Sequence, residues 1–296
     1  MHGVRDARPP VLTESRKAPL IPADLQDQVA RALREDVGSG DLTASLVPAA
    51  RRAVATVITR EDAVICGQPW FDATFAQLGG NVSVNWLVRE GTRVSAGSAL
   101  CSLQGDARAL LTGERTALNF LQLLSATATA ARRFVDAVAG TGCEILDTRK
   151  TIPGLRTAQK YATAVGGARN HRLGLYDAVL IKENHIAAAG SIAAAIAAAR
   201  NATRATVEIE VENLDELRQA LAGKPDMVLL DDFSLEDLRA AVASNRSQGS
   251  PVKLEASGGI HLDNVRDIAL TGVDFISVGS LTKHVHAVDL SMRIGA

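Results

Sequence analysis

The sequence predicts an α/β fold in which an α+β domain precedes a domain of repeated β/α units. In the second half of the chain, short apolar runs typical of buried strands start 35, 29, 20, 25 and 23 residues apart. This spacing accommodates a strand, a helix and two loops. Helical periodicity lies between the runs, so we expect a parallel sheet covered by helices. The runs are residues 143–146, 178–181, 207–211, 227–230, 252–256 and 275–278.

The polar residues that end these runs favour a barrel over an open, doubly wound sheet. An open nucleotide-binding sheet would normally carry GxGxxG or GxxxxGK[ST] after its first strand, and this chain has neither motif. Nearly every predicted strand instead ends in a reactive side chain, as expected where strands converge on one barrel mouth. These strand-end residues are Arg149, Lys150, Lys182, Glu210, Asp231, Ser257 and Ser277.

Several connecting helices are predicted from their first residues. The stretches after Asn213 and Ser234 begin with a capping residue and early acids, which suit the positive end of a helix dipole. The alanine-rich stretch 190–200 contains Ser191 as an N-cap, and alanine is the best helix former. We therefore expect a short packed helix there rather than a membrane segment.

The first part of the chain has a different pattern. Residues 25–38 read as an amphipathic helix that ends at Gly38. Residues 53–67 and 81–105 alternate apolar and polar side chains between glycine-containing turns, as antiparallel strands do. Residues 111–140 form a long helical stretch that leads into the β/α domain. An N-terminal α+β domain is the simplest interpretation.

Composition excludes several classes of protein. The 32 Lys and Arg residues nearly balance 33 Asp and Glu residues, giving a net charge of −1, which argues against a general nucleic-acid binder or a polybasic membrane-surface protein. The first twenty residues lack a secretory signal, and no apolar run approaches the roughly 18 residues that span a bilayer. Cys66, Cys101 and Cys143 are scattered, without zinc spacing, and read as buried apolar residues of a cytoplasmic protein.

The near-zero total charge conceals two opposed segments. Residues 149–182 contain seven Lys or Arg against one acid, whereas residues 208–236 contain nine acids against two basic residues. If strands bring both to one mouth, the site can attract carboxylates or phosphates and also hold a hard cation through oxygen ligands. Some of the acids occupy helix starts and are expected to be solvated, namely Glu212, Asp215, Glu216 and Glu236.

Seven motifs, in order, resemble the quinolinate phosphoribosyltransferase family. They are GERTALNFLQLLS, LDTRKTIPGLRTAQKYA, GGARNHRLGLYDAVLIKENH, VEIEVEN, LLDDF, LEASGGI and VDFISVGSLTKH. The resemblance covers roughly residues 25–295 and is most specific from Glu114 to His185. It implies that quinolinate and 5-phosphoribosyl-1-pyrophosphate are converted, with Mg²⁺, to nicotinate mononucleotide, pyrophosphate and CO2 in NAD biosynthesis.

The resemblance also implies an architecture. The family has an N-terminal open-faced α/β sandwich domain, a partly open α/β barrel, and a homodimer in which one subunit's sandwich covers its partner's barrel mouth. In linear terms we expect an extension over 1–22, a sandwich domain over 23–126 and a barrel over 127–282. The tail 283–296 is expected to return to the sandwich domain.

Roles follow from matching each motif to the family. Arg115 would reach the neighbouring subunit's quinolinate, and a cationic lining would surround the substrates. Two acids would face the ribose and its Mg²⁺, and two loops would hold the 5-phosphate through backbone amides. The cationic lining is Arg149, Lys150, His171, Arg172 and Lys182; the acids are Glu210 and Asp231; the loops are Ser257, Gly258 and Gly259 with Ser277, Val278 and Gly279.

The chain departs from the family pattern at two positions. Ala168 stands where the family commonly has the third glycine of GGG, which would matter if that backbone needs a positive φ. Asp232 stands where the family commonly has asparagine, and its additional charge could alter Mg²⁺ affinity. His171 is expected to hydrogen-bond in the core or behind the substrate contacts rather than to transfer a proton.

The implied chemistry suits these residue types. Quinolinate carries two adjacent carboxylates, which planar guanidinium groups match with paired hydrogen bonds, so Arg115, Arg149 and Arg172 suit its recognition. Glu210 and Asp231 can stabilise an oxocarbenium-like transition state, while Lys150 and Mg²⁺ neutralise the departing pyrophosphate. Two alternatives remain open: a relative that takes nicotinate without decarboxylation, and a non-catalytic anion-binding homologue.

Overall fold

The computed structural model describes residues 19–247, 249 and 252–295, and these form two compact units. One unit, here called the barrel unit, consists of residues 134–149 and 169–279. The other, here called the sandwich unit, consists of residues 19–133, 150–168 and those from 280 onward.

This division differs from the linear boundaries at three places, one of which is the start of the returning tail, at residue 280 rather than 283. Residues 150–168 group with the sandwich unit, although they lie within the expected barrel span of 127–282. The first boundary falls after Arg133, inside the helix α3 (Ala107–Ala137), rather than at residue 126. Most of the expected extension over 1–22 lies outside the described residues.

The barrel unit contains a parallel sheet in the order β6-β11-β10-β9-β8-β7. Because β6 and β7 end the sheet, the barrel is partly open, in agreement with the predicted fold class. Every strand coincides with one of the predicted apolar runs to within one residue at each end. The strands are β6 (Glu144–Leu146), β7 (Ala178–Ile181), β8 (Thr206–Val211), β9 (Met227–Asp231), β10 (Lys253–Ser257) and β11 (Phe275–Ser277).

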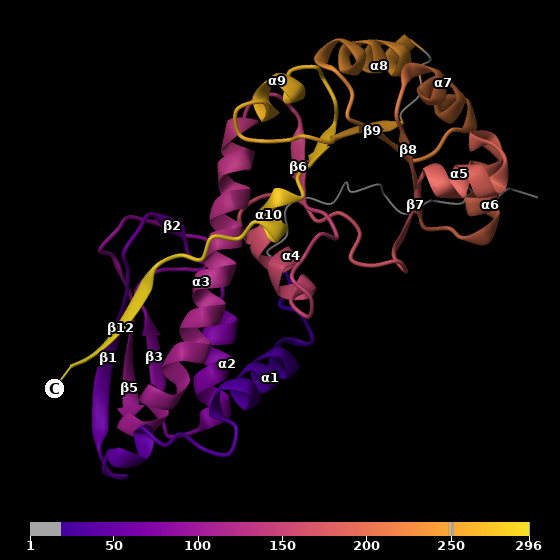
Figure 1. The fold of residues 1–296 in the computed structure, drawn as a ribbon. Coiled ribbons are helices and arrows are strands. Elements are labelled where there is room, and N and C mark those ends of the chain that lie inside the picture. The colour runs from indigo at the N-terminus through magenta and orange to yellow at the C-terminus, as the bar shows by residue number, and fades with distance from the viewer. Residues whose placement is uncertain (1–18, 248, 250–251, 296) are drawn as a thin grey trace, which may run out of the picture. The chain divides into compact units, whose positions relative to one another are not determined.

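Helices cover the outer side of this curved sheet (Figure 1). Three of them begin at the predicted caps: Ser191 Oγ accepts from the Ala194 amide, Asn213 Oδ1 from the Glu216 amide, and Ser234 Oγ from the Asp237 amide. The helices are α5 (Glu183–Ala189), α6 (Ile192–Ala202), α7 (Leu214–Gly223), α8 (Leu235–Ser247) and α9 (Val265–Ala269).

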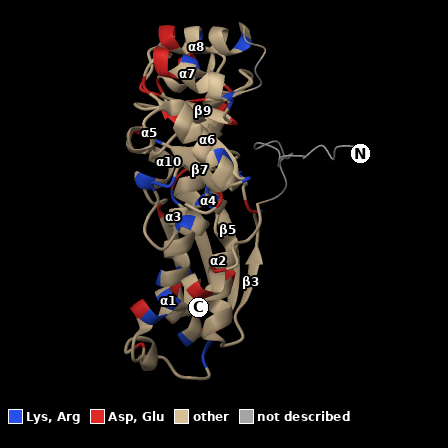
Figure 2. Ribbon diagram, turned by 90° about the vertical axis from the view of Figure 1, so that its right-hand side faces the viewer, with Lys and Arg blue, Asp and Glu red and all other residues tan. Residues whose placement is uncertain are grey.

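Acidic side chains gather on α7 and α8 and at their starts (Figure 2). Glu212, Asp215 and Glu236 are exposed there, so the prediction that these acids are solvated is confirmed. Part of the negative segment therefore belongs to helix surfaces. The acids that remain as candidates for chemistry are those on the strands themselves.

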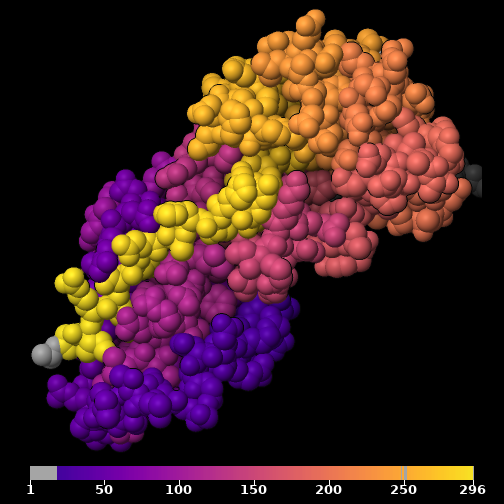
Figure 3. Space-filling view, viewed as in Figure 1, coloured from indigo at the N-terminus to yellow at the C-terminus, as the bar shows by residue number. Residues whose placement is uncertain are grey.

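The sandwich unit is built on an antiparallel sheet in the order β12-β1-β5-β3. Its last strand comes from the C-terminus: Val57 of β1 pairs with Met292 of β12, and the final residues run along the early part of the chain (Figure 3). The strands are β1 (Arg52–Thr59), β3 (Ser83–Trp86), β5 (Ala99–Asp106) and β12 (Leu290–Gly295), and β2 (Ala63–Val64) pairs separately with β4 (Arg93–Val94).

Helices pack on this sheet around a core of Leu, Val, Phe and Cys side chains. The helix α1 (Leu25–Val37) ends at Gly38, as predicted, and α3 is the predicted long helix. The remaining elements are α2 (Gln68–Leu78), α4 (Arg156–Val165), α10 (Ser280–Lys283) and the 3₁₀ turn Ala44–Leu46. Among the described helices, none combines the length and the apolar character that crossing a bilayer requires.

The three cysteines are buried and free, as predicted. Burial raises the pKa of the Cys101 thiol and of the Cys143 thiol to about 12, and the pKa of Cys66 is also raised by burial. A thiol with a raised pKa forms little thiolate and is chemically inert. The cysteines therefore serve packing.

Replacing Gly166 with alanine should destabilise the sandwich unit, because α3 and α4 approach too closely there for a methyl group. A Cβ at residue 166 would lie 2.5 Å from the Ala128 carbonyl oxygen and 2.6 Å from the Ala131 Cβ. Such overpacking costs about 1–3 kcal/mol. Urea denaturation should report this loss in the free energy of unfolding. The control is Gly295→Ala, where the nearest atom would be 3.9 Å away; equal losses in both variants would contradict the clash.

Candidate active site

The carboxyl ends of the barrel strands bring several predicted site residues onto neighbouring strands. Ser257 ends β10 and Asp231 ends β9, and the two are direct partners in the parallel ladder. Glu210 of β8 pairs with Leu229 of β9, and Ser277 ends β11 next to β10. Because paired strands lie about 4.8 Å apart, these side chains border one edge of the sheet.

Lys182 and Glu210 form an ion pair at the open side of this edge. The Nζ of Lys182, directly after β7, contacts Oε2 of Glu210 on β8. The Lys182 amide also donates to His185 Nδ1 at 3.0 Å, which fixes the start of α5. A positive and a negative side chain are thus held together at this edge of the sheet.

Arg149 and Arg172 also belong to the barrel unit, and the charge of Arg149 acts on Arg172 together with those of Glu208 and Asp177. Burial lowers the pKa of the Arg172 guanidinium, and the positive charge of Arg149 lowers it further. A pKa lowered by a like charge means that the two guanidinium groups lie close enough to repel each other. Arg172 Nη1 also donates to the carbonyl of Ala178, the first residue of β7, at 3.5 Å. A dicarboxylate between the two cations would relieve the repulsion.

His171 lies against two buried carboxyl groups. Its Nε2 is 2.9 Å from Glu208 Oε2 on β8 and 3.4 Å from Glu255 Oε2 on β10. Burial, followed by the charge of Glu255, raises the pKa of Glu208 to about 7. Burial acts to lower the pKa of His171, whereas the hydrogen bonds and charges of Glu208 and Glu255 act to raise it. Because the Arg172 amide donates to Nδ1 of His171 at 2.8 Å, the protons of this coupled group lie on Nε2 and the two carboxyl groups rather than on Nδ1.

Sequence reasoning missed Glu208, Glu255 and Asp147 in this region. Asp147 is fully buried; Oδ1 accepts from the His171 amide at 2.8 Å, and Oδ2 accepts from Asn170 Nδ2 at 2.7 Å. One signal was available, because Glu208 stands two residues before Glu210 and strand residues i and i+2 share a face. Glu255 carries the same signal, because it stands two residues before Ser257 on β10, whereas Asp147 lies after the end of β6.

The loop after β10 contains two glycines in the left-handed region of backbone conformation. Gly258 and Gly259 have φ of +90° and +56°, a region that favours glycine. A Cβ on Gly258 would lie 2.0 Å from Asp232 Oδ1, so the Asp232 side chain lies directly against this loop. Asp232 itself has φ of +54°, which aspartate tolerates better than most residues.

The loop after β11 requires a correction at Val278. Its amide donates to the Leu146 carbonyl at 2.9 Å, and its side chain is buried. An amide has one hydrogen, so in this structure Val278 holds β11 against β6 rather than offering a donor to phosphate. Ser277 is also largely buried. Gly279, the last predicted residue of this loop, is half-buried.

The concern about Ala168 is removed by its backbone. Among the described residues, the non-glycine positions with positive φ are Asn81, Lys224 and Asp232, so Ala168 needs no glycine conformation. The position that needs a glycine conformation is Gly167, with φ of +97°. Ala168 is buried and donates its amide to the Thr163 carbonyl at 3.2 Å, which ends α4.

Two predicted site residues belong to the sandwich unit. Arg115 is exposed on α3 and forms no ion pair or hydrogen bond with the described residues. Lys150 is exposed directly after the barrel segment, and its carbonyl accepts from Thr282 Oγ1 at 2.7 Å. The barrel unit thus gathers Arg149, His171, Arg172, Lys182, Glu210, Asp231 and both phosphate loops, whereas Arg115 and Lys150 are described apart from it.

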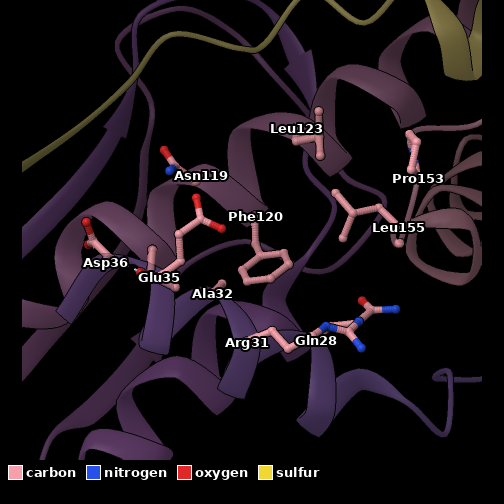
Figure 4. Close-up of a pocket in the computed structure, with 12 residues that line it drawn as sticks. Gln28, Arg31, Ala32, Glu35, Asp36, Asn119, Phe120, Leu123, Pro153 and Leu155 are labelled. Atoms are coloured by element: carbon pink, nitrogen blue, oxygen red, sulfur yellow. Dashed lines mark hydrogen bonds between the residues drawn. The ribbon is translucent and has the colours of Figure 1, made fainter. Parts of the chain in front are cut away.

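A cavity of about 420 Å³ lies within the sandwich unit, and none of the predicted site residues is among the described residues that line it. Figure 4 shows Gln28, Arg31, Glu35 and Asp36 of α1 facing Phe120 and Leu123 of α3 across it. Its lining mixes one basic residue with two acids and apolar side chains. It offers neither the cationic clamp nor the strand-end acids of the barrel unit.

Two family descriptions match consecutive parts of the chain. "Quinolinate phosphoribosyl transferase, N-terminal domain" matches residues 41–125, and "Quinolinate phosphoribosyl transferase, C-terminal domain" matches residues 127–293. The chain belongs to the quinolinate phosphoribosyltransferase family. The resemblance stated from the sequence motifs is thereby confirmed, and the conserved fold of the family accounts for both units.

Relatives of this phosphoribosyltransferase cover nearly its whole length. It is 42% identical to a nicotinate-nucleotide pyrophosphorylase [carboxylating] of Mycobacterium leprae, over 91% of this chain and 96% of that one. It is 40% identical to the human protein of the same name, over 94% of each chain. The structure of the nicotinate-nucleotide pyrophosphorylase from Francisella tularensis superimposes with a TM-score of 0.89 and 45% identity, covering 95% of this chain and 100% of that one.

Proposed function

We propose that this chain converts quinolinate and 5-phosphoribosyl-1-pyrophosphate to nicotinate mononucleotide, pyrophosphate and CO2. The observation that carries this proposal is that one unit contains Arg149 and Arg172 together with the Lys182–Glu210 ion pair and the Gly258–Gly259 loop. A dicarboxylate explains the cations, a phosphate explains the loop, and a ribose explains the acids. Membership of the family supports the same reaction.

The cations would select and orient quinolinate. Two guanidinium groups can take two carboxylates with paired hydrogen bonds, which fixes the plane of the pyridine ring and directs its nitrogen. Arg172 takes the stronger clamp on the 3-carboxylate, while Arg149 and Lys182 orient the 2-carboxylate. The ring nitrogen then forms a bond to C1 of the ribose as the bond from C1 to pyrophosphate breaks.

The acids would act on the ribose as positive charge develops at C1. Glu210 is only 15% exposed and Asp231 ends the neighbouring strand, so solvent screens their charges weakly. Two carboxylates with substrate phosphates form an oxygen donor set that suits Mg²⁺. Mg²⁺, when bound by Glu210 and Asp231, would neutralise the phosphate oxygens. Lys150 would pair with the departing pyrophosphate.

Decarboxylation would follow from the charge left on the ring. Once the nitrogen is bonded to ribose, the ring is a pyridinium that stabilises the carbanion formed as the 2-carboxylate leaves as CO2. A proton then replaces CO2 on that carbon. Lys182 is 45% exposed, so its ammonium holds the carboxylate less firmly than a buried clamp would, which leaves the carboxylate able to depart.

Neither alternative explains the site as well. A nicotinate enzyme needs to bind one carboxylate, so paired cations at Arg149 and Arg172 favour the dicarboxylate. Human nicotinic acid phosphoribosyltransferase has a TM-score of 0.63 at 15% identity, which is a likeness of fold alone. A non-catalytic anion binder would not need Glu210 and Asp231 beside the cations.

The assembly and the compartment are part of the proposal. A homodimer is supported by the exposed position of Arg115, whose guanidinium has no partner among the described residues and is free to serve a neighbouring subunit. A reducing, cytoplasmic environment is supported by three buried cysteines that remain unpaired.

The direct test is an assay of the purified chain with Mg²⁺, phosphoribosyl pyrophosphate and either quinolinate or nicotinate. We expect quinolinate to yield nicotinate mononucleotide and CO2 in equal amounts, and nicotinate to yield neither at a comparable rate. Mononucleotide from nicotinate without CO2 would establish the first alternative. Binding of quinolinate without turnover would establish the second.

The variant Arg172→Lys should raise the KM for quinolinate at least about tenfold, because a lysine cannot replace a bidentate guanidinium contact of roughly 1.5–3 kcal/mol. The KM for phosphoribosyl pyrophosphate should stay within about twofold. Initial rates over a matrix of both substrate concentrations give both constants. An unchanged quinolinate KM would remove Arg172 from the clamp.

A further inference from the structure

The segment before Arg172 is anchored at its start by β6. The Arg169 amide donates to the Ile145 carbonyl at 2.8 Å, and Arg169 Nε contacts Glu144 Oε2 at 2.9 Å. Asp147 then accepts from the His171 amide at 2.8 Å. The backbone is therefore fixed up to residue 171, and the next amide must find a different acceptor.

That acceptor is the ring of His171. The Arg172 amide donates to His171 Nδ1 at 2.8 Å. A ring nitrogen that accepts a hydrogen bond carries no hydrogen, so the neutral imidazole holds its hydrogen on Nε2. Nε2 faces Glu208 Oε2 at 2.9 Å and Glu255 Oε2 at 3.4 Å. The ring thus links the Arg172 backbone to the strands β8 and β10.

Burying the carboxyl groups of Glu208 and Glu255 lowers the stability of the folded state. The side chains of Glu208 and Glu255 are 3% and 0% exposed. Glu208 Oε1 and both carboxyl oxygens of Glu255 accept no hydrogen bond from the described residues. Buried carboxyl oxygens without donors are unfavourable, and an apolar pair of similar volume would be tolerated better. Such a cost calls for a reason beyond stability.

A metal ion does not provide that reason. His171, Glu208 and Glu255 have potential ligand atoms within 4.8 Å of one another. A metal at this position would need the lone pair of Nε2. Because Nδ1 uses its own lone pair for the Arg172 amide, Nε2 carries the hydrogen of the neutral ring and has no lone pair to offer.

We propose that Glu208 and Glu255 are positioning residues for quinolinate recognition: they orient the His171 ring, which through Nδ1 fixes the backbone from which Arg172 reaches the substrate. This inference rests on the proposed function, because it assigns the two acids to the quinolinate half of the site. They need not touch either substrate. Their effect should therefore pass through Arg172 and appear in the binding of quinolinate.

The decisive variant is the double substitution Glu208→Met and Glu255→Met, which removes both acceptors at nearly constant volume. We expect the KM for quinolinate to rise at least tenfold, with the KM for phosphoribosyl pyrophosphate within twofold. The double substitution Glu208→Gln and Glu255→Gln restores an amide oxygen that accepts from Nε2, and should keep the quinolinate KM within threefold of wild type. The control Glu236→Gln removes an exposed carboxylate of α8 that does not face the ring, and should leave both constants unchanged.

A double-mutant cycle tests whether the effect passes through Arg172. If it does, the methionine variant should raise the quinolinate KM much less in the Arg172→Lys background than in the wild type. Full additivity would overturn the proposal. So would an equal rise in both KM values, or a folded methionine variant with the wild-type quinolinate KM.

A spectroscopic measurement on the wild-type protein keeps the proposal testable even if the methionine variant does not fold. Nitrogen NMR of histidine-labelled protein should give a His171 ring protonated on Nε2 and bare on Nδ1. A ring bare on Nε2, a ring protonated on both nitrogens, or a bound metal found by elemental analysis that shifts this signal, would overturn the proposal. Turnover of quinolinate by the wild type is measured first, so failure of the proposed function is recognised separately.

Discussion

Replacing Glu210 with glutamine should lower kcat by about 10²–10³ while changing the quinolinate KM little, because it removes a negative charge aimed at the ribose as positive charge develops there. The carboxylate is held in place by Lys182 Nζ and is largely shielded from solvent. Glutamine keeps the size and shape of the side chain but not its charge. Single-turnover measurements of mononucleotide formation, with both substrates saturating, give the rate of the chemical step.

The matched control for this prediction is Glu212→Gln. Glu212 lies two residues further along the same strand end, but it is exposed at the start of α7. Removing its charge should change kcat by less than about twofold, as is usual for surface substitutions. If Glu210→Gln also retained wild-type kcat, the strand-end acids would not act on the transition state. If only the KM for phosphoribosyl pyrophosphate rose, Glu210 would contribute to the binding of that substrate rather than to the chemical step.

The strands of the barrel could be predicted because they are buried on both faces. A parallel strand covered by helices must be apolar at nearly every position, so runs such as 178–181 and 227–230 stand out from the amphipathic stretches between them. Three helix starts were equally visible, because Ser191, Asn213 and Ser234 use their side chains for local hydrogen bonds. Apolar strands and side-chain N-caps can be predicted because each depends on residues that are close together in the sequence.

The helix α2 was not predicted, because its signals depend on a distant residue. Gly67 and Pro69 begin the helix, but the orphan amides of Gly67 and Gln68 are satisfied by the carboxylate of Glu90, more than twenty residues away. Burial raises the pKa of this carboxyl group, so the cap is itself part of the core. A cap that comes from elsewhere in the chain leaves no local pattern.

The candidate site was predictable in part for the same reasons. Strand ends located Lys182, Glu210 and Asp231, since the barrel fold fixes which end of each strand carries chemistry. The sequence could not reveal that the Val278 amide donates to the Leu146 carbonyl, because that hydrogen bond depends on the pairing of β11 with β6. Strand spacing places Glu208 and Glu255 on the same faces as Glu210 and Ser257, but it could not reveal that both carboxyl groups meet the His171 ring.

Replacing Arg115 with alanine should lower kcat/KM for quinolinate at least about thirtyfold, because truncating one member of a desolvated charge pair costs about 2 kcal/mol or more. In this chain the guanidinium is exposed on α3 and lacks a partner among the described residues. Under the proposed assembly it completes the site of the other subunit. Its loss should therefore harm a barrel that carries no substitution of its own.

Mixing two inactive variants tests this directly. When Arg115→Ala and Glu210→Gln chains are dissociated together and reassembled in equal amounts, about half of the dimers contain one of each. One site of such a dimer combines an intact barrel with an intact Arg115, and the other lacks both residues. The mixture should recover about a quarter of wild-type activity in a twofold-symmetric dimer. If Arg115 instead served its own subunit, every site would lack one residue and no activity would return.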